Sequence, residues 1–580
     1  MRRAVARIMQ KDKLAYFGLL IIMAIGISIR LIPVLEVGGI WLADLDPYRN
    51  LRAVNKVLEQ GKMPLFDPLS VAPNGTSATY ATSQGYYMLN AVLILTSGLD
   101  SIKMMSISPI ICEPALLLTV YAFALALTKS RWAGLATMFF ASLGQGWSMI
   151  GMIGTCPLAE NFGVVIFTLT LLLCWKYNED KKKSPLLLMI SGFLLGTSFL
   201  IHPITYFYLV IVLFIYTILL CSIRKRICEL IYFSKLIFIS SFAIAIQWSL
   251  IKDLKYSFYF THGALWLATL QPVYTVIDFY VVLSEVGVIV SFLSLLEIAL
   301  VVFDKKWEKN ILLSWVLVML FIIWSSQITS IRLFLANLPF GAFFILSHRV
   351  MPYLHVALSL LGGLAVAEYI WPSVKHISGY LSFPSSSASI KIGALLIIVL
   401  LLAFIPTIQS SISYAINYSS FAKWAQRHSS LIEWVKENTG PYDVFIVNEL
   451  CLGEVLRTLA ERPTVFTLSY QDIATPDIEK RMLLYSAVYI IGYDERVAQR
   501  LLYDFNVSYV IVIRDQFVVD LLNKRYVYVA PEESFPSYLK WLDEKFYLKR
   551  IYSDPSGQFY VYSVNRDVLL KDVALPEVKP

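Results

Sequence analysis

Apolar segments long enough to cross a lipid bilayer recur along the chain up to residue 410, and this pattern excludes an ordinary soluble domain. A helix that spans the hydrocarbon core needs about 20 mostly apolar residues. Hydrophobic residues make up 57% of the 580 residues, charged residues only 16%, and the mean hydropathy is +0.64. The sequence therefore predicts a polytopic α-helical membrane protein with about eleven spans. The predicted spans are 14–35, 107–127, 132–150, 160–177, 185–201, 203–222, 234–252, 285–303, 310–327, 350–371 and 390–410.

Clusters of basic residues predict the orientation of these spans. Lys and Arg are enriched in cytoplasmic loops. Four clusters fall on one side of the membrane if the N-terminus is cytoplasmic: 181–183, 224–226, 305–309 and 375–376. The net charge of +8 lies largely in such loops, so no nucleic-acid partner is expected. We predict a multi-pass protein of the cell membrane, embedded in membrane lipids, with an extracytoplasmic C-terminal part.

Two further apolar segments, 85–98 and 331–347, leave the number of spans open. They are re-entrant or lie along the outer surface if there are about eleven spans, and they raise the number to about 13 if they cross. The second interpretation moves the loop at 150–160 to the opposite face, so we prefer the first.

The composition changes after residue 410, which predicts a second domain. Short β-type runs at 444–447, 465–466, 509–513 and 559–564 alternate with helical patterns and are separated by Asp, Gly and Pro. Alternating strands and helices predict a small α/β domain. We divide the chain into a membrane-embedded catalytic domain, an extended first outer loop within it, and an extracytoplasmic α/β domain. Their boundaries are 1–412, 36–106 and 413–580.

Acidic residues at the predicted outer ends of the spans are the strongest candidates for chemistry. Asp44 and Asp46 open the first outer loop, and Asp46-Pro47 predicts a helix start, because a carboxylate caps free N–H groups and Pro suits the first helical position. Glu160 and Glu285 open toward the same face. Ionisable groups at the membrane boundary are costly and tend to mark function. The alternative is that each only complements a helix dipole.

Carboxylates gathered on one face would bind a divalent cation, Mg²⁺ or Mn²⁺, that neutralises a phosphate-bearing substrate. The predicted metal ligands are Asp46, Glu160 and Glu285. Asp46 is alternatively a general base that activates an acceptor.

Basic and aromatic residues beside these acids are candidates for substrate binding. Arg349, at the outer start of a late span, would hold a phosphate through a bidentate pair, unless it only extends its charge from a helix end to the interface. Arg332 is a weaker candidate for the same role. His202 and His262 are interpreted as structural or substrate-adjacent rather than as metal ligands. Asp44 and Tyr48, beside Asp46, are expected to contact substrate, although Tyr rings also commonly line membrane interfaces.

The motif Asp46-Pro-Tyr, followed by a helix that ends in Glu59-Gln-Gly61, resembles the catalytic subunit of oligosaccharyltransferase and, more broadly, the GT-C superfamily of membrane glycosyltransferases. The resemblance implies that Asp46 is the first-loop Asp of the family. It also implies that Pro157–Asn161 holds the second acidic motif, with Glu160, and that Glu285 closes the later loop motif. Arg349 corresponds to the Arg near the lipid phosphate.

Two departures from that family concern the metal and the acceptor. Leu158 stands where the second motif usually has another acidic or metal-binding residue, which leaves a weaker or absent metal site open. The Trp-Trp-Asp-Tyr-Gly motif, with which that subunit reads the hydroxyl residue of its acceptor, is not in the sequence. Its place is taken by Asn448–Glu454.

We therefore predict a membrane glycosyltransferase that transfers a sugar or oligosaccharide from a polyprenyl-phosphate-linked donor to a protein or lipid acceptor on the outer face. Asp46 would be the base or a metal ligand, supported by Glu160 and Glu285, and Arg349 would stabilise the departing lipid phosphate. One alternative is a protein-Asn oligosaccharyltransferase with a diverged acceptor motif. The other is a transporter or lipid flippase, although transport sites usually lie near the middle of the membrane.

Overall fold

The structure is a computed structural model of the chain, and most of the polypeptide is described. The described residues are 2–38, 41–43, 45–62, 67, 69–70, 83–150, 152–180, 184–225, 228–251, 279–303, 309–336, 347–373, 404–467, 478–514, 517–520, 525–528 and 534–570.

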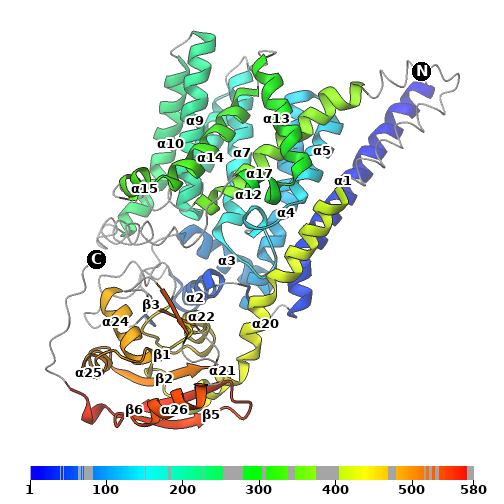
Figure 1. Ribbon diagram of the computed structural model, residues 1–580. Coiled ribbons are helices and arrows are strands. Elements are labelled where there is room, and N and C mark those ends of the chain that lie inside the picture. The colour runs from blue at the N-terminus through cyan, green and yellow to red at the C-terminus, as the bar shows by residue number, and fades with distance from the viewer. Residues whose placement is uncertain are drawn as a thin grey trace.

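A bundle of apolar helices makes up the first two thirds of the molecule (Figure 1). Six helical segments of the described residues are long and apolar enough to cross a membrane. They belong to α1 (Arg2–Glu36), α4 (Ser101–Thr128), α7 (Ala159–Glu179), α9 (Pro203–Arg224), α14 (Asn310–Gln327) and α17 (Met351–Ala365) with its continuation η5 (Val366–Ile370). A seventh span results if α12 (Phe279–Val286) and α13 (Val288–Phe303), bent by 106° at Gly287, are counted together. The predicted multi-pass membrane protein is confirmed.

Other predicted spans take different forms. The segment 132–150 contains the short helix α5 (Arg131–Ser142), a non-helical stretch at 143–145, and the single turn α6 (Trp147–Ile150). The segment 185–201 is α8 (Pro185–Ile201), of 17 residues, and 234–252 falls in α10 (Cys228–Ile251). Most of 390–410 lies outside the described residues, so the number of spans stays a prediction.

Helix α17 occupies the centre of the bundle, with every residue from Met351 to Ala365 buried. It packs against α5 and α13. A Cβ atom at Gly363 would lie 2.1 Å from Thr137 Oγ1 and 2.5 Å from its backbone nitrogen. The glycine is therefore required for the close approach of α17 and α5. This packing fixes the position of α17, the helix that directly follows Arg349.

The C-terminal α/β domain is built on one mixed sheet with strand order β1-β2-β6-β5. β1 (Val444–Val447) and β2 (Val507–Ile513) are parallel, whereas β6 (Phe559–Val564) is antiparallel to both β2 and β5 (Leu548–Ser553). The predicted strands at 444–447, 509–513 and 559–564 are confirmed. The predicted run at 465–466 is not a strand, but Thr464 just before it forms isolated parallel bridges with Ser70 and with Phe445. A hairpin of β3 (Phe517–Asp520) and β4 (Arg525–Tyr528) completes the strands described.

Alternate residues of the sheet face two different cores, as the pleat of a strand requires. Val444, Ile446 and Val510 pack inside the domain. Phe445 and Ile511 point the other way, into a core that includes Leu51 and Tyr86 of the segment 36–106. The helices of the domain are α20 (Ser420–Arg427), α21 (Ser429–Asn438), α22 (Leu450–Val455), η6 (Leu456–Ala460), α24 (Ile478–Tyr489), α25 (Glu495–Asp504), α26 (Phe535–Asp543) and the turn η8 (Arg566–Val568).

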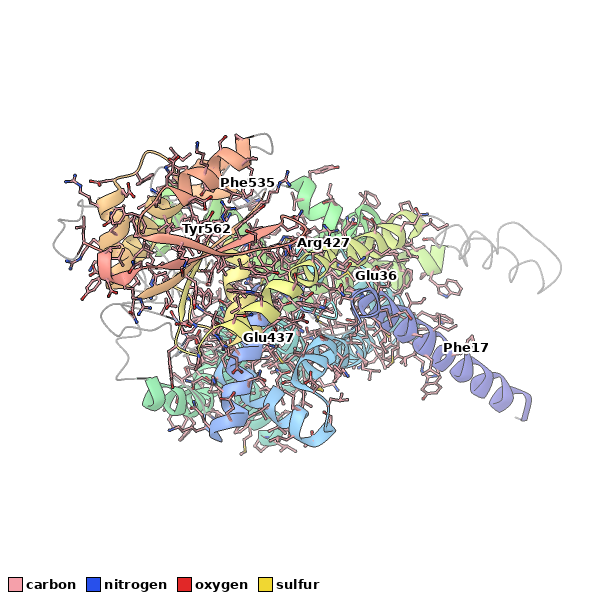
Figure 2. The ribbon with its side chains drawn as sticks, turned by 90° about the horizontal axis from the view of Figure 1, so that it is seen from below. Phe17, Glu36, Arg427, Glu437, Phe535 and Tyr562 are labelled. Carbon is pink, nitrogen blue, oxygen red and sulfur yellow. The ribbon has the colours of Figure 1, made fainter. Side chains whose placement is uncertain are left out.

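Helices α2 (Leu45–Gln60) and α3 (Gln84–Ser97) lie between the bundle and the sheet (Figure 1). α3, which covers most of the apolar segment 85–98, has 14 residues, which is too short for a span. At the edge of the same junction, Glu36 at the end of α1 pairs with Lys423 at 2.6 Å, near the helices that carry Arg427 and Glu437 (Figure 2). The candidate residues at the start of α2 are thus placed where the two domains meet.

Candidate active site

Asp46 stands in the first turn of α2, and hydrogen bonds tie this helix start to the segment that precedes α7. The backbone N–H of Ala43 donates to the Thr155 carbonyl at 2.8 Å, and the Asn50 amide donates to the Pro157 carbonyl at 2.9 Å. Glu160 begins the first turn of α7, three residues after Pro157. These bonds therefore bring the first two predicted acidic motifs to one place.

Arg349 joins the two carboxylates. It lies in the turn η4 (Ser347–Val350) that leads into α17. Its Nη2 is 2.8 Å from Asp46 Oδ2, and its Nη1 is paired with Glu160 Oε1. A second guanidinium, that of Arg49, is 3.0 Å from Asp46 Oδ1. The spacing of Asp46 and Arg49, three residues apart on a helix, is a local sequence signal for this second pair.

A histidine and two hydroxyl groups lie on the buried side of this cluster, next to Glu160. His202 Nε2 is 3.5 Å from Glu160 Oε1, and its Nδ1 is 2.9 Å from Thr205 Oγ1. Thr205 Oγ1 is in turn 2.5 Å from the Tyr353 hydroxyl. The Asp46 and Arg349 side chains are 25% and 20% exposed, whereas those of Glu160 and His202 are 6% and 7% exposed. A substrate therefore meets Asp46 and Arg349 first, with Glu160 and His202 supporting them from below.

The two arginines keep Asp46 ionised. Burial raises the pKa of Asp46, but Arg49 and Arg349 outweigh this effect and hold the pKa below its ordinary value. A carboxylate with this pKa is a negatively charged acceptor for a proton or for a cation throughout the physiological range.

Glu285, the third predicted acid, is held by the segment between α5 and α6. Its Oε2 accepts a hydrogen bond from the Ser148 backbone N–H at 2.9 Å, and its carbonyl accepts one from the Gln145 N–H at 3.2 Å. A Cβ at Gly146, where φ is +55°, would lie 2.6 Å from the Glu285 carboxyl carbon. These hydrogen bonds fix Glu285 on the segment 145–148, whereas Asp46 and Glu160 are joined through Arg349.

The remaining predicted substrate contacts have different outcomes. Tyr48 is only 1% exposed, and its hydroxyl accepts a hydrogen bond from the Leu42 N–H at 3.1 Å. It belongs to the core of the junction, so its ring is not open to a substrate. Arg332, in α15 (Thr329–Ala336), is buried, and no described contact connects it to Arg349. Asp44 and His262 lie outside the described residues.

The side chains of the cluster fit a guanidinium between Asp46 and Glu160 rather than a metal ion. Within the described ranges, no group of three or more His, Cys, Asp or Glu side chains is placed to hold a metal. Leu158, at the second position of the acidic motif, is 2% exposed and packs with Cys156. The metal site predicted at Asp46, Glu160 and Glu285 stays a prediction.

The stretch Asn448–Glu454, which stands where the missing Trp-Trp-Asp-Tyr-Gly motif would be, leads into α22 and forms most of it. The Glu449 side chain caps this helix by accepting the Leu452 N–H, and burial raises the pKa of Glu449 to about 7. The folded protein therefore holds a proton on Glu449 between its ordinary value of 4.5 and about 7, and the unfolded chain does not. The free energy of unfolding consequently falls as the pH rises through this window.

Glu449→Gln is expected to remove this loss of stability. Relative to the variant, the free energy of unfolding of the full-length protein in detergent should fall by at most about 3 kcal/mol between about pH 5 and about pH 8. The melting temperature should fall with it. Glu544→Gln, at an exposed carboxylate of the same domain, is the matched control and should keep the wild-type pH dependence. If the melting temperatures of wild type and Glu449→Gln changed with pH in parallel, the pH dependence would not come from Glu449.

Comparison with known structures identifies the fold. No family model and no curated protein matches the sequence. The archaeal oligosaccharyltransferase AglB from Archaeoglobus fulgidus, in complex with an inhibitory peptide and a dolichol-phosphate, matches with a TM-score of 0.63 and 13% identity over 97% of this chain and 75% of that chain. A structure of an oligosaccharyltransferase from the same organism in complex with Zn and sulfate matches with a TM-score of 0.59 and 13% identity, covering 94% and 72% of the two chains. ArnT from Cupriavidus metallidurans, bound to undecaprenyl phosphate, matches with a TM-score of 0.54 and 10% identity, covering 94% and 97%. The chain therefore has the fold of GT-C membrane glycosyltransferases, as its sequence motifs predict.

Proposed function

We propose that this protein is a membrane glycosyltransferase that transfers a sugar or oligosaccharide from a polyprenyl-phosphate-linked donor to an acceptor on the outer membrane face. The observation that carries the proposal is the Asp46–Arg349–Glu160 cluster at the junction of the two domains. The GT-C fold adds support, because two neighbours with that fold bind dolichol-phosphate and undecaprenyl phosphate.

The chemistry assigns one role to each side chain of the cluster. A nucleophilic atom of the acceptor bonds to the anomeric carbon while the bond from that carbon to the donor phosphate oxygen breaks, and the electron pair leaves with the lipid phosphate. Asp46 takes the proton of the acceptor as general base. Arg349 stabilises the negative charge that develops on the lipid phosphate. Glu160, buried and paired with His202, fixes the position of Arg349.

Glu285 and the C-terminal domain complete the proposal. Glu285, held by the Ser148 N–H, supports the cluster from the later loop rather than by direct pairing with Asp46. The C-terminal domain positions the acceptor, because its sheet shares a core with the helix that carries Asp46.

The proposal is tested with purified full-length protein in lipid nanodiscs. Dolichyl- and undecaprenyl-linked sugars, as phosphates and pyrophosphates, are supplied with a membrane lipid extract and a peptide containing Asn-x-Thr as acceptors. We expect consumption of a donor and release of the lipid phosphate or pyrophosphate, measured by mass spectrometry.

The acceptor arms separate the alternatives. Transfer to the peptide that is lost when its Asn is replaced by Gln assigns a protein-Asn oligosaccharyltransferase, which the peptide-bound neighbour makes worth testing. Transfer to a lipid assigns the other acceptor class. Unchanged donors, together with movement of a solute or lipid across proteoliposomes, would overturn the glycosyltransferase proposal in favour of a transporter.

A further inference from the structure

We infer that Arg349 supplies in this protein the positive charge that a divalent cation was expected to supply at Asp46 and Glu160, so that a phosphate-bearing donor is processed without a metal ion. The inference rests on the proposed function, since it describes how the same site balances the charge of its donor.

The geometry of the guanidinium is the first reason. Its two Nη atoms contact two carboxylates at once, with Nη2 2.8 Å from Asp46 Oδ2 and Nη1 paired with Glu160 Oε1. A guanidinium is a rigid planar fork, so the oxygens that pair with it are spread along its edge. A metal ion requires oxygens that converge on one point at about 2.0 to 2.6 Å. Asp46 and Glu160 therefore cannot bind the same metal ion while Arg349 keeps these contacts.

The surrounding residues offer little to a metal ion. Leu158 is an apolar residue buried against Cys156, and the Glu285 carboxylate is bonded to the Ser148 N–H. His202 is 3.5 Å from Glu160 Oε1, the oxygen that also pairs with Arg349. The donor set that the described residues bring together thus consists of two carboxylates that already share a cation, with the His202 and His348 imidazoles beside them.

The charge of the cluster is the second reason. Asp46 and Glu160 carry two negative charges, and Arg349 and Arg49 carry two positive charges, so the cluster is formally neutral. A donor phosphate therefore meets no net repulsion. The phosphate approaches on the exposed side, where the Arg349 side chain is 20% exposed and Glu160 only 6%. The guanidinium can hold both its carboxylate partners and a phosphate oxygen, because it has five N–H donors.

Metal uptake by the full-length protein tests the inference independently of catalysis. The protein is treated with EDTA, desalted and titrated with Mn²⁺, and free Mn²⁺ is followed by electron paramagnetic resonance. We expect the same uptake by wild type and by Glu160→Gln, because the site takes none. Arg349→Gln should take up one further Mn²⁺ per chain, and Arg349→Gln/Glu160→Gln should lose it again. Arg349→Lys keeps the positive charge and is the matched control, with uptake equal to that of wild type.

Donor consumption is the second measurement. We expect wild type to turn over at the same rate in EDTA as with added Mg²⁺ or Mn²⁺. Uptake by wild type that falls by one Mn²⁺ per chain in Glu160→Gln, or turnover that requires an added metal, would overturn the inference. If no donor is consumed under any condition, the proposed function fails, and Mn²⁺ uptake by wild type still decides whether Arg349 excludes a metal.

Discussion

Replacing Asp46 by Asn is expected to lower kcat for donor consumption by about 10²- to 10⁴-fold, the usual contribution of a positioned general base. An amide oxygen still accepts a hydrogen bond from Arg349, so the side chain keeps its place, but it cannot take the proton of the acceptor. The Asp46 side chain is 25% exposed, so we expect the substitution to cost little stability. A loss of turnover would then reflect the chemistry and not unfolding. Release of the lipid phosphate or pyrophosphate in nanodiscs measures the effect.

Glu59→Gln is the matched control for this substitution. Glu59 lies on the same helix, is 49% exposed and pairs only with Lys56 among the contacts described. Its replacement removes one carboxylate from α2 without touching the cluster, so turnover should stay at the wild-type level. Unchanged turnover in Asp46→Asn, with a melting temperature equal to that of wild type, would remove Asp46 from the role of base.

The sequence predicts those parts of the site that depend on local signals. The strands at 444–447, 509–513 and 559–564 follow from β-type runs, and the structure has them. The helix predicted to start at Asp46-Pro47 is also present, but it begins one residue earlier, at Leu45. The Asp46 carboxylate pairs with Arg49 and Arg349. The pairing of Arg349 with Asp46, across 303 residues, has no local signal. The position of Arg349 before a late span and the resemblance to GT-C enzymes both predict a phosphate-binding role for it, but neither predicts its carboxylate partners.

Tertiary packing explains the expectations that the structure changes. Tyr48 looks like a surface residue next to an acidic motif, but the core between α2 and the sheet buries it. The segment 132–150 looks like one span by hydropathy, yet its helix ends at Ser142 and its backbone turns at Gly146, where φ is +55°. Gly144 and Gly146 were a sequence signal for that break. The break is what allows 145–148 to hold Glu285.

Arg52→Met is expected to destabilise the full-length protein by about 3 to 5 kcal/mol, the cost of breaking a buried ion pair by removing one partner. Arg52 lies six residues after Asp46 and is 4% exposed. Its Nη1 is 2.5 Å from Glu454 Oε1 in α22, and its Nη2 is 2.6 Å from Asp67 Oδ2. Nη1 also donates to Thr458 Oγ1 at 2.9 Å. The substitution leaves two buried carboxylates without this partner, at the place where the C-terminal domain joins the helix that carries Asp46.

Thermal unfolding in detergent measures the loss of stability, and two further variants serve as controls. Arg52→Met/Glu454→Leu removes both charges, so it should cost less than the sum of the two single substitutions. Arg496→Met breaks an exposed pair with Asp494 in the same domain and should leave the melting temperature unchanged. Wild-type stability in Arg52→Met would contradict the stabilising role given to the Arg52 ion pairs.

Because Thr458 Oγ1 also donates to the Tyr48 carbonyl at 3.1 Å, loss of the Arg52 contacts also affects the first turn of α2. Arg52→Met should therefore lower donor turnover even at temperatures where the protein stays folded.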